Sequence, residues 1–407
     1  MSPIDVLLVF LAFYPVVSGA AWMVGGVMFR LLEERPRAVD PPDGWPAVTI
    51  LVPAYNEEKV IAGCVQALRR VDYPSLEILL LNDGSTDNTV AAARAAARGD
   101  ARFTVVDDGV NRGKADRLND GIRRARNDLV LVTDADTHLH ADAVTHLVRC
   151  MLRSPRYAAV AGCPRVTNRG RVIATMQMLE TASLIGLIRR THALTGRVGT
   201  VAGVLGLFRR DAVLAVGGYD PTMATEDIEL TWRLLQAGHL TGFTPNALVG
   251  MQVPETLSGI WAQRTRWARG QGEVLRTHAR TVARPKHAMI WPIVLETLLS
   301  YVWVGCMLIA MGWVLILWIV SPGDTRFGSM LAWGVGVAVI AMIQIVIAVL
   351  VDFRLDPRLP YACVLLPLYP LAYWTINALA ALTAQTPGLL RGPRKHRVIW
   401  DLPRSDT

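Results

Sequence analysis

The sequence predicts a doubly wound α/β domain with a mostly parallel sheet, joined to an α-helical transmembrane region. Three observations predict this fold. Short apolar runs alternate with helix-like stretches between residues 48 and 136. Polar side chains cluster where these runs end. Charge-free stretches long enough to cross a membrane stand at the start of the chain and after residue 288.

The apolar residues are unevenly distributed along the chain. Of its 407 residues, 52% are hydrophobic, which is high for a soluble enzyme. The excess lies at the start and after residue 288, so the layout is one anchor, one globular domain and one membrane block. The expected parts are a transmembrane helix (1–30), a cytoplasmic globular domain (40–255), amphipathic interfacial helices (256–287), a transmembrane block (288–390) and a basic cytoplasmic tail (391–407).

The first apolar stretch, Val6–Phe29, holds 24 residues without a charge, enough to cross a hydrocarbon core of ~30 Å as a helix. A signal peptide is the alternative, but no positive region precedes the stretch. Arg30, Arg35 and Arg37 follow it instead. The positive-inside rule therefore places Met1 outside and the globular domain in the cytoplasm.

Cysteine usage and charge exclude several classes of function. The five cysteines form no CxxC pair, so neither a disulfide framework nor a zinc site is indicated. The net charge of +8 could suggest a nucleic-acid partner. The arginines, however, gather near the apolar segments, where anionic lipids and phosphate-bearing substrates both favour them. We therefore expect no nucleic acid as a partner.

The globular domain contains four apolar runs that read as buried parallel strands, because each is nearly continuous in apolar residues. The expected strands are Val48–Tyr55, Leu76–Asp83, Phe103–Asp108 and Asp128–Asp136, and the expected helices between them are Glu57–Arg70, Asn88–Arg98 and Lys114–Arg126. Ligands bind at the carboxyl edge of such sheets. Neither GxGxxG nor GxxxxGK[ST] occurs, so no Rossmann site or P-loop is indicated.

Two acidic motifs follow predicted strands. In Asp134-Ala135-Asp136, an extended chain would point both carboxylates the same way, so that they could hold one divalent cation. A pair of solvated turn aspartates is the alternative. In Asp83–Asp87, the side chains could bind a ligand or cap the next helix, with Gly84 supplying the turn.

Two further motifs begin predicted helices. Asn111-Arg112-Gly113-Lys114 offers a helix N-terminus and two cations to a pyrophosphate, and a plain surface loop is the alternative. Thr225-Glu226-Asp227 precedes an amphipathic helix. In the simplest interpretation Thr225 caps this helix and the acids favour its N-terminus. In the functional interpretation Asp227 is a general base.

The motif Gln263-Arg264-Thr265-Arg266-Trp267 lies in Leu257–Arg280, where apolar residues alternate with basic ones. This pattern is typical of a helix that rests on a membrane surface. We expect both roles to hold, with the QxxRW end turned toward the active site.

The order of these motifs is more specific than any one of them. PxYNE, NDGSTD, RGKxxxLN, DAD, TED and QxxRW, followed by membrane helices, resemble the family 2 processive glycosyltransferases, whose catalytic domain is of the GT-A type. The resemblance covers nearly the whole chain. Within the family, the chain is most similar to the bacterial branch that makes poly-β-1,6-N-acetylglucosamine. The stretches that carry this similarity are Trp22–Val27, Ser183–Thr191, Thr200–Arg210, Met223–Ile228 and Gln263–Val274.

The resemblance implies a role for each motif. The residues implied in donor binding are Tyr55, Glu57, Asp83, Lys114, Asp134, Arg266 and Trp267. Those implied at the acceptor and diphosphate are Gln263, Arg264 and Gly203. Asp227 is implied as the base, beside Glu226. Asp136 is implied as the ligand of a divalent cation, Mg²⁺ or Mn²⁺, together with Asp134.

The implied reaction is inverting, processive transfer of N-acetylglucosamine from UDP-GlcNAc to a β-linked polysaccharide, which the protein extrudes across the inner membrane. The implied partners are the donor, the polymer, the bilayer and a small membrane accessory subunit. Alternatives are another β-glycan of glucan, chitin or hyaluronan type, or transfer to a lipid carrier. A channel with a nucleotide-sensing domain is disfavoured, because the apolar segments hold few ionisable residues that could mark a pathway. Glu296 is the exception.

The last apolar segment, Leu359–Ala384, contradicts a simple count of crossings. If this segment and the two before it, Thr297–Val320 and Ser329–Val351, each crossed once, the tail would lie outside the cell. The tail is basic, however, and the positive-inside rule places basic segments in the cytoplasm. Prolines interrupt the segment, so we expect it to re-enter or to bend along the membrane. Trp400 is then expected to cover the donor site as a gating residue, with an interfacial tryptophan as the alternative. The basic residues are Arg391, Arg394, Lys395 and Arg397, and the prolines are Pro360, Pro367 and Pro370.

Overall fold

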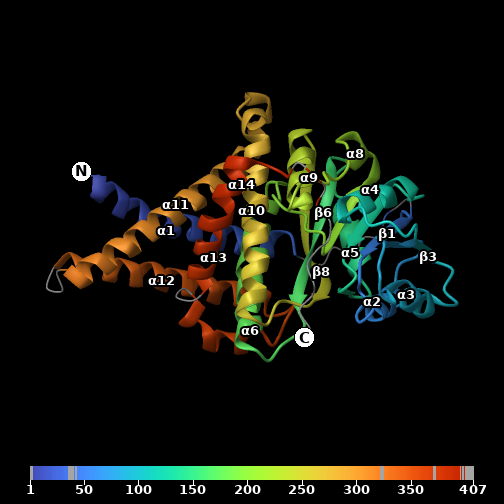
Figure 1. Cartoon of the computed structure of the whole chain (residues 1–407), viewed down its shortest axis with the longest axis horizontal. Coiled ribbons are helices and arrows are strands. Elements are labelled where there is room, and N and C mark those ends of the chain that lie inside the picture. The colour runs from blue at the N-terminus through green and yellow to red at the C-terminus, as the bar shows by residue number, and fades with distance from the viewer. Residues whose placement is uncertain are drawn as a thin grey trace.

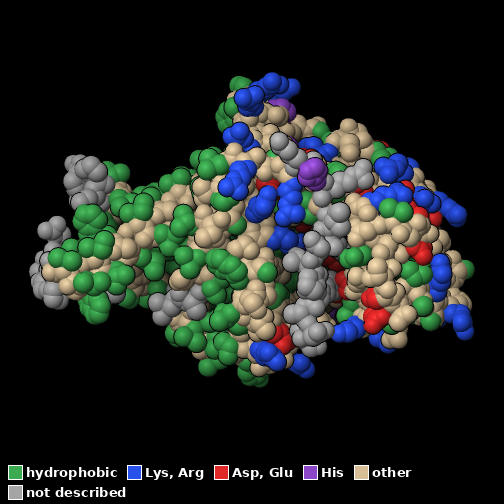
Figure 2. Space-filling view, viewed as in Figure 1, with side chains coloured by type: hydrophobic (Ala, Val, Ile, Leu, Met, Phe, Trp, Pro, Cys, Tyr) green, Lys and Arg blue, Asp and Glu red, His purple; other side chains and the backbone are tan. Residues whose placement is uncertain are grey.

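The computed structural model describes residues 3–34, 41, 44–320, 325–369, 373–394, 396 and 398. An α/β domain lies at one end of the molecule, and three long helices project from it at the other (Figure 1). These helices are α1 (Pro3–Leu32), α11 (Trp291–Val320) and α12 (Thr325–Asp352). Hydrophobic side chains cover them, whereas Lys and Arg gather toward the α/β domain (Figure 2).

The sheet has eight strands in the order β3-β2-β1-β4-β7-β6-β8-β5. The first four are parallel to one another, β7 runs antiparallel to β4 and β6, and β6 and β8 are parallel. All seven residues of β1 are buried, as a strand covered on both faces requires. The predicted fold class is confirmed. The strands are β1 (Val48–Ala54), β2 (Leu76–Asn82), β3 (Phe103–Val106), β4 (Leu129–Thr133), β5 (His138–Leu139), β6 (Tyr157–Val166), β7 (Leu205–Arg209) and β8 (Leu240–Met251).

Helices cover both faces of the sheet and create two cores. On one face pack α2 (Ile61–Arg69), α3 (Thr89–Ala97) and α5 (Ala143–Met151). The opposite face packs against α4 (Lys114–Arg124) and α9 (Glu226–Gln236), with the short helix α8 (Arg210–Ala215). This division follows from apolar strands that present a side chain to alternate faces at each step.

A layer of helices joins the α/β domain to the projecting helices. Along the chain, α6 (Val172–Glu180), the π-helical η1 (Thr181–Ile188) and α7 (Arg189–Ala193) follow one another and are mostly buried. They pack against α1 and α12. Beside them α10 (Leu257–Val282) runs across the junction and ends before η2 (Pro285–Ile290) (Figure 1).

Among the residues that the structure describes, four helices are long and apolar enough to cross a membrane: Val6–Leu32, Val172–Ala193, Pro285–Val320 and Ala332–Asp352. The second is largely buried inside the protein, so its hydropathy also has a packing explanation. The predicted segment Leu359–Ala384 is not one continuous helix. In the described residues it divides into η3 (Leu359–Leu365), α13 (Trp374–Ala380) and η5 (Ala381–Gln385), followed by α14 (Thr386–Arg391). The helices from α13 to α14 pack against α10, while the path of this segment relative to the membrane stays a prediction.

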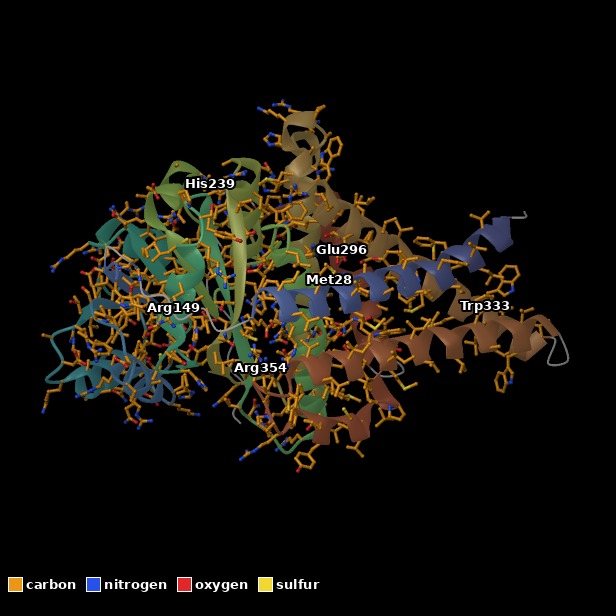
Figure 3. The ribbon with its side chains drawn as sticks, turned by 180° about the vertical axis from the view of Figure 1, so that it is seen from behind. Met28, Arg149, His239, Glu296, Trp333 and Arg354 are labelled. Atoms are coloured by element: carbon orange, nitrogen blue, oxygen red, sulfur yellow. The ribbon has the colours of Figure 1, made fainter. Side chains whose placement is uncertain are left out.

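A buried network of ion pairs fastens the membrane helices to the α/β domain. Arg190 of α7 contacts Glu34, just after α1, at 2.5 Å and Asp352, at the end of α12, at 2.7 Å. Arg165 of β6 contacts the other oxygen of Asp352 at 2.8 Å. Arg354, which lies at this junction in Figure 3, pairs with Glu34. Removing one partner would leave the other charge buried and unpaired, at a cost of roughly 3–5 kcal/mol. These ion pairs therefore hold the helices in place against the α/β domain.

Glu296 of α11 is also paired. Its carboxylate accepts hydrogen bonds from Trp22 Nε1 of α1 at 3.1 Å and from His192 Nε2 of α7 at 2.7 Å. Figure 3 places Glu296 close to the α/β domain and Trp333 far out along the projecting helices. The one acid singled out in these segments therefore joins three helices, which gives it a structural role.

Candidate active site

The predicted donor residues lie along one edge of the sheet. Strands β2, β1 and β4 are neighbours, so the residues that follow them meet at the carboxyl edge. Tyr55 and Glu57 follow β1, Asp83 follows β2, and Asp134 follows β4. Glu57 and Asp83 are buried, at 4% and 1% exposure.

Asp83 fastens the loop that leads into α4. Its carboxylate accepts hydrogen bonds from the backbone N–H groups of Arg112 and Gly113, both at 2.9 Å. Gly113 has φ +91°, a conformation that favours glycine. Arg117 Nε lies 3.4 Å from the same carboxylate. The structure thus shows Asp83 shaping the Asn111–Lys114 loop, and its predicted contact with uridine remains a prediction.

Lys114 is the centre of the site. It is the first residue of α4, and its Nζ lies 2.5 Å from Asp134 Oδ1 and 3.9 Å from Glu226 Oε1. Burial by itself lowers the pKa of Lys114, but the nearby carboxylates outweigh this effect and raise it well above its usual value. The side chain is therefore a permanent cation at the sheet edge.

Asp227 lies beside Lys114 at the start of α9. One carboxylate oxygen accepts a hydrogen bond from the Gly203 N–H at 3.3 Å, and the other from the Ile228 N–H at 2.9 Å. A Cβ at Gly203 would stand 3.0 Å from Lys114 Nζ and 4.0 Å from Asp134 Oδ1. Because glycine has no Cβ, the backbone at position 203 can lie close to Lys114 and Asp134 and still donate to Asp227.

Glu226 has a different electrostatic environment. Burial raises its pKa, the positive charge of Lys114 opposes that rise, and the charge of Asp227 adds to it. The pKa of Glu226 is raised on balance. The positive charge of Arg266, in the QxxRW motif of α10, also acts to lower the pKa of Glu226.

Two local expectations were wrong. The chain around Asp134 and Asp136 is not extended, because β4 ends at Thr133 and a turn follows in which Thr137 N–H donates to the Asp134 carbonyl. The alternation of side chains in a strand therefore does not place this pair. Thr225 does not cap α9 with its side chain, since its hydroxyl is buried without a hydrogen-bond partner in the described residues.

The residues fit a divalent cation that arrives with a diphosphate. Within the described ranges, no group of three His, Cys, Asp or Glu side chains could hold a metal alone. Mg²⁺ is commonly bound through one or two carboxylates and completes its shell with phosphate oxygens and water. Asp134 and Asp136 at the sheet edge supply that number of carboxylates. Asp134 also contacts Lys114, so this pair lies next to the cation of the site.

The residues of the QxxRW motif separate in space. Arg264 is buried and turns away from the carboxylates: its guanidinium donates to Glu180 and to the Tyr373 hydroxyl, both at 2.6 Å. It also lies over the Trp267 ring, 4.5 Å from the centroid. The Gln263 amide oxygen is buried without a partner in the described residues, as expected of a group whose hydrogen bond is supplied by a ligand. Trp400 lies outside the described residues.

The sequence did not reveal two residues that support the site. Tyr219 is buried, its backbone is held by the Asn119 amide at 2.7 and 2.8 Å, and its hydroxyl has no partner in the described part of the chain. Burial and the charges of Glu226 and Asp227 raise its pKa, so it remains a donor near the carboxylates. Glu273 of α10 accepts a hydrogen bond from the Ala224 N–H at 3.0 Å. The Gly-Gly-Tyr-Asp turn was the available signal for Tyr219, whereas nothing in the sequence pointed to Glu273.

Known proteins resemble this chain in sequence and in fold. Residues 46–270 match the family described as glycosyltransferase like family 2. A poly-β-1,6-N-acetyl-D-glucosamine synthase from Staphylococcus aureus (strain COL) is 34% identical over 402 residues, which cover 97% of each chain. The protein of that name from Staphylococcus epidermidis is 31% identical over the same shares. Among solved structures, a mannosyltransferase from Pyrobaculum calidifontis in complex with GDP-Man and Mn²⁺ is 21% identical, covers 92% of this chain and 99% of its own, and has a TM-score of 0.64.

Proposed function

The chain belongs to glycosyltransferase family 2, and from this membership we propose that it polymerises N-acetylglucosamine from UDP-GlcNAc into a β-1,6-linked polysaccharide. The full-length similarity to the staphylococcal synthases supports the choice of sugar and linkage. The observation that carries the chemistry is the convergence of Lys114 with Asp134, Glu226 and Asp227 at the sheet edge. A cation beside carboxylates suits a reaction in which a diphosphate leaves while a hydroxyl loses its proton.

In this proposal Asp227 is the general base. It takes the proton from the acceptor hydroxyl as that oxygen attacks the anomeric carbon from the side opposite the diphosphate. The new carbon–oxygen bond forms while the bond to the diphosphate breaks, so an α-linked donor gives a β-linked product. The Gly203 and Ile228 N–H groups orient the Asp227 carboxylate for this step.

Lys114 and Arg266 would face the departing UDP. Its negative charge grows as the bond breaks, and fixed cations in a partly buried site stabilise that charge. A bound Mg²⁺ or Mn²⁺ at Asp136 and Asp134 would supply further positive charge to the diphosphate. The Mn²⁺ named for the structurally similar mannosyltransferase is in keeping with such a cation.

The protein is proposed to be a multi-pass protein of the inner membrane with its α/β domain in the cytoplasm, where the donor is made. Apolar helices long enough to span a bilayer and the basic residues after α1 support this orientation. Processive synthesis would pass the polymer from Asp227 toward the junction with these helices, and a small membrane subunit is a candidate partner.

The test is incubation of membranes that contain the protein with radiolabelled UDP-GlcNAc, UDP-glucose or UDP-glucuronic acid, followed by linkage analysis. We expect a high-molecular-mass β-1,6-linked product from UDP-GlcNAc alone. Membranes with the Asp227→Asn variant provide the background. Preferential incorporation of glucose would assign the protein to glucan synthesis, and label found only in a lipid-soluble monosaccharide would replace the polymerase by a lipid-carrier transferase.

A further inference from the structure

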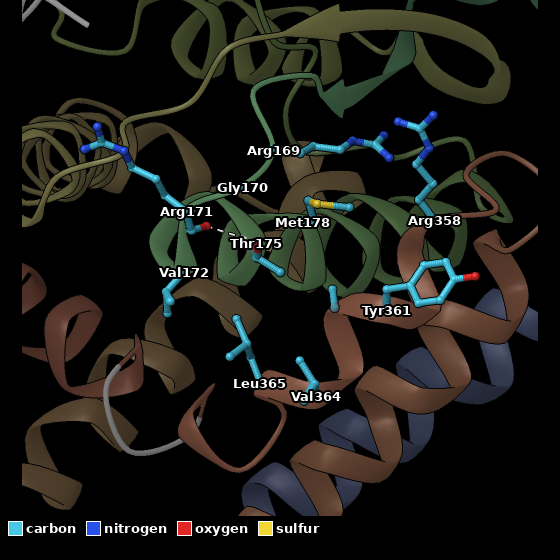
Figure 4. A pocket seen from close by; sticks show the side chains of 11 residues that line it. Arg169, Gly170, Arg171, Val172, Thr175, Met178, Arg358, Tyr361, Val364 and Leu365 are labelled. Atoms are coloured by element: carbon cyan, nitrogen blue, oxygen red, sulfur yellow. Dashed lines mark hydrogen bonds between the residues drawn. The ribbon is translucent and has the colours of Figure 1, made fainter.

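An open groove lies between the start of α6 and η3, away from the candidate active site. The cavity measures ≈ 430 Å³. Arginine side chains lie along one side of it and apolar side chains along the other, with Met178 between them (Figure 4). The arginines are Arg169, Arg171 and Arg358, and the apolar residues opposite them are Val172, Val364 and Leu365.

The charges of the groove leave one positive charge uncompensated. Arg169 pairs with Asp356 through two hydrogen bonds of 2.8 and 3.2 Å, and Arg171 pairs with Glu255 at 3.0 Å. Arg358 makes no ion pair through its side chain with any residue that the structure describes. At the end of the groove where Arg169 and Arg358 lie near each other (Figure 4), two arginines against the one carboxylate of Asp356 leave +1, which matches the single negative charge of a phosphodiester. Guanidinium groups that are already oriented by carboxylates suit phosphate oxygens well.

The apolar side of the groove is unusually exposed. Tyr361 and Val364 are each 80% exposed, and Val172 is 55% exposed. Water does not favour such a surface, whereas a lipid layer does. The groove also adjoins the membrane helices, because α12 ends at Asp352 and Arg358 follows within a few residues. With α12 in the bilayer, as proposed above, these arginines would lie near the end of that helix, at the depth of lipid headgroups.

We propose that this groove binds an anionic phospholipid from the leaflet that faces the α/β domain. The phosphodiester would lie against Arg358 and Arg169, whose side chains lie near each other and away from Arg171 (Figure 4), and an acyl chain would cover Val364 and Leu365. A second cavity of ≈ 370 Å³ adjoins the first through Arg169 and Arg358. Its other lining residues, Thr167, Asp356 and Pro357, give a polar headgroup such as glycerol room and hydrogen-bond partners. Basic pockets beside membrane helices bind anionic headgroups in this way.

The test uses the full-length protein, purified in detergent and analysed by native mass spectrometry. Binding of phosphatidylglycerol is compared with binding of phosphatidylcholine, first for the wild type and then for Arg358→Gln and Val364→Asn. We expect the wild type to retain phosphatidylglycerol preferentially and Arg358→Gln to bind it about tenfold more weakly, as the loss of one charge-assisted contact predicts. Arg94→Gln is the matched control, because Arg94 is an exposed arginine on α3, at the far end of the α/β domain.

Further arms separate the sources of phosphate and the effects of folding. Inorganic phosphate at millimolar concentration should not displace the lipid, and binding of phosphate alone with equal strength would overturn the lipid assignment. Unchanged UDP binding by each variant shows that it is folded. Equal retention of the two lipids by the wild type, or equal phosphatidylglycerol binding by Arg358→Gln and Arg94→Gln, would also overturn the proposal. It does not depend on the sugar that the enzyme transfers.

Discussion

Gly270 of α10 lies directly against Thr225, the residue that precedes Glu226 and Asp227. A Cβ at position 270 would stand 2.4 Å from the Thr225 hydroxyl oxygen, well inside contact distance. Glu273, one helical turn further along α10, holds the Ala224 N–H. The two contacts together mean that α10, which carries the QxxRW motif, sets the position of the proposed base.

Replacement of Gly270 by alanine should therefore impair catalysis more than donor binding. The added methyl group would displace Thr225 and with it Asp227, and a shift of about 1 Å in a reacting group can cost about 10²-fold in rate. We expect polymer synthesis to fall by that order, while UDP affinity stays within a few-fold of the wild type. Gly305→Ala is the control, because a Cβ at this glycine of α11 would meet no atom within 4 Å. Equal activity of the two variants would show that the contact does not position the base.

The variant Asp227→Asn should bind UDP normally and lose nearly all polymer synthesis. The amide keeps the size of the side chain but cannot accept the proton, and general-base catalysis typically contributes ~10²–10⁴-fold. Initial rates of polymer formation and UDP affinity by calorimetry measure the two effects. Asp142→Asn, at an exposed carboxylate before α5, is the control. Output within a few-fold of the wild type would remove Asp227 from the role of base.

Asp136→Asn should change the metal dependence of UDP binding. An amide is a weaker ligand for a hard cation than a carboxylate, so more Mg²⁺ or Mn²⁺ should be needed to reach half-maximal UDP binding. The measurement is a titration of UDP affinity against each metal ion. If the variant gives the wild-type curve, Asp136 is not a ligand.

The topology of the C-terminal segment can be tested from outside the cell. We expect the tail to be cytoplasmic, so a single cysteine at Ser405 should resist an impermeant thiol reagent in intact cells and react after the membrane is opened. The five native cysteines are first replaced, and the cysteine-free protein must retain polymer synthesis. Rapid labelling in intact cells would contradict both the bent segment and a gating role for Trp400.

The parallel half of the sheet could be predicted from sequence within a few residues, because β1, β2 and β4 are continuous apolar runs that end in polar residues. The antiparallel half could not. Strand β7, for example, inserts between β4 and β6, and this pairing is set by contacts between distant parts of the chain. The buried helices from Val172 to Ala193 also gave no clear signal, because an apolar stretch reads alike whether protein or lipid covers it.

The candidate site was likewise predictable from sequence only in part. The sheet order brings Asp134 beside Lys114, and the motif order had already grouped these residues with Asp227. Arg264 was assigned to the diphosphate, yet it contacts Glu180 and Tyr373, which lie 84 and 109 residues away along the chain. Sequence spacing cannot show such partners. The sequence likewise cannot show that the Tyr219 hydroxyl is buried without a hydrogen-bond partner in the described residues.

The buried ion-pair network that joins α7, α1 and α12 affects how the enzyme can be produced for study. An excised α/β domain that begins after Glu34 and ends before α11 would lose Glu34 and Asp352, the carboxylates that Arg190 and Arg165 contact. It would also uncover the apolar side chains of α6 and η1 that now pack against α12. A fragment with such a surface tends to self-associate. Purification in detergent or in a nanodisc with α1, α11 and α12 retained is therefore the appropriate preparation for enzymology.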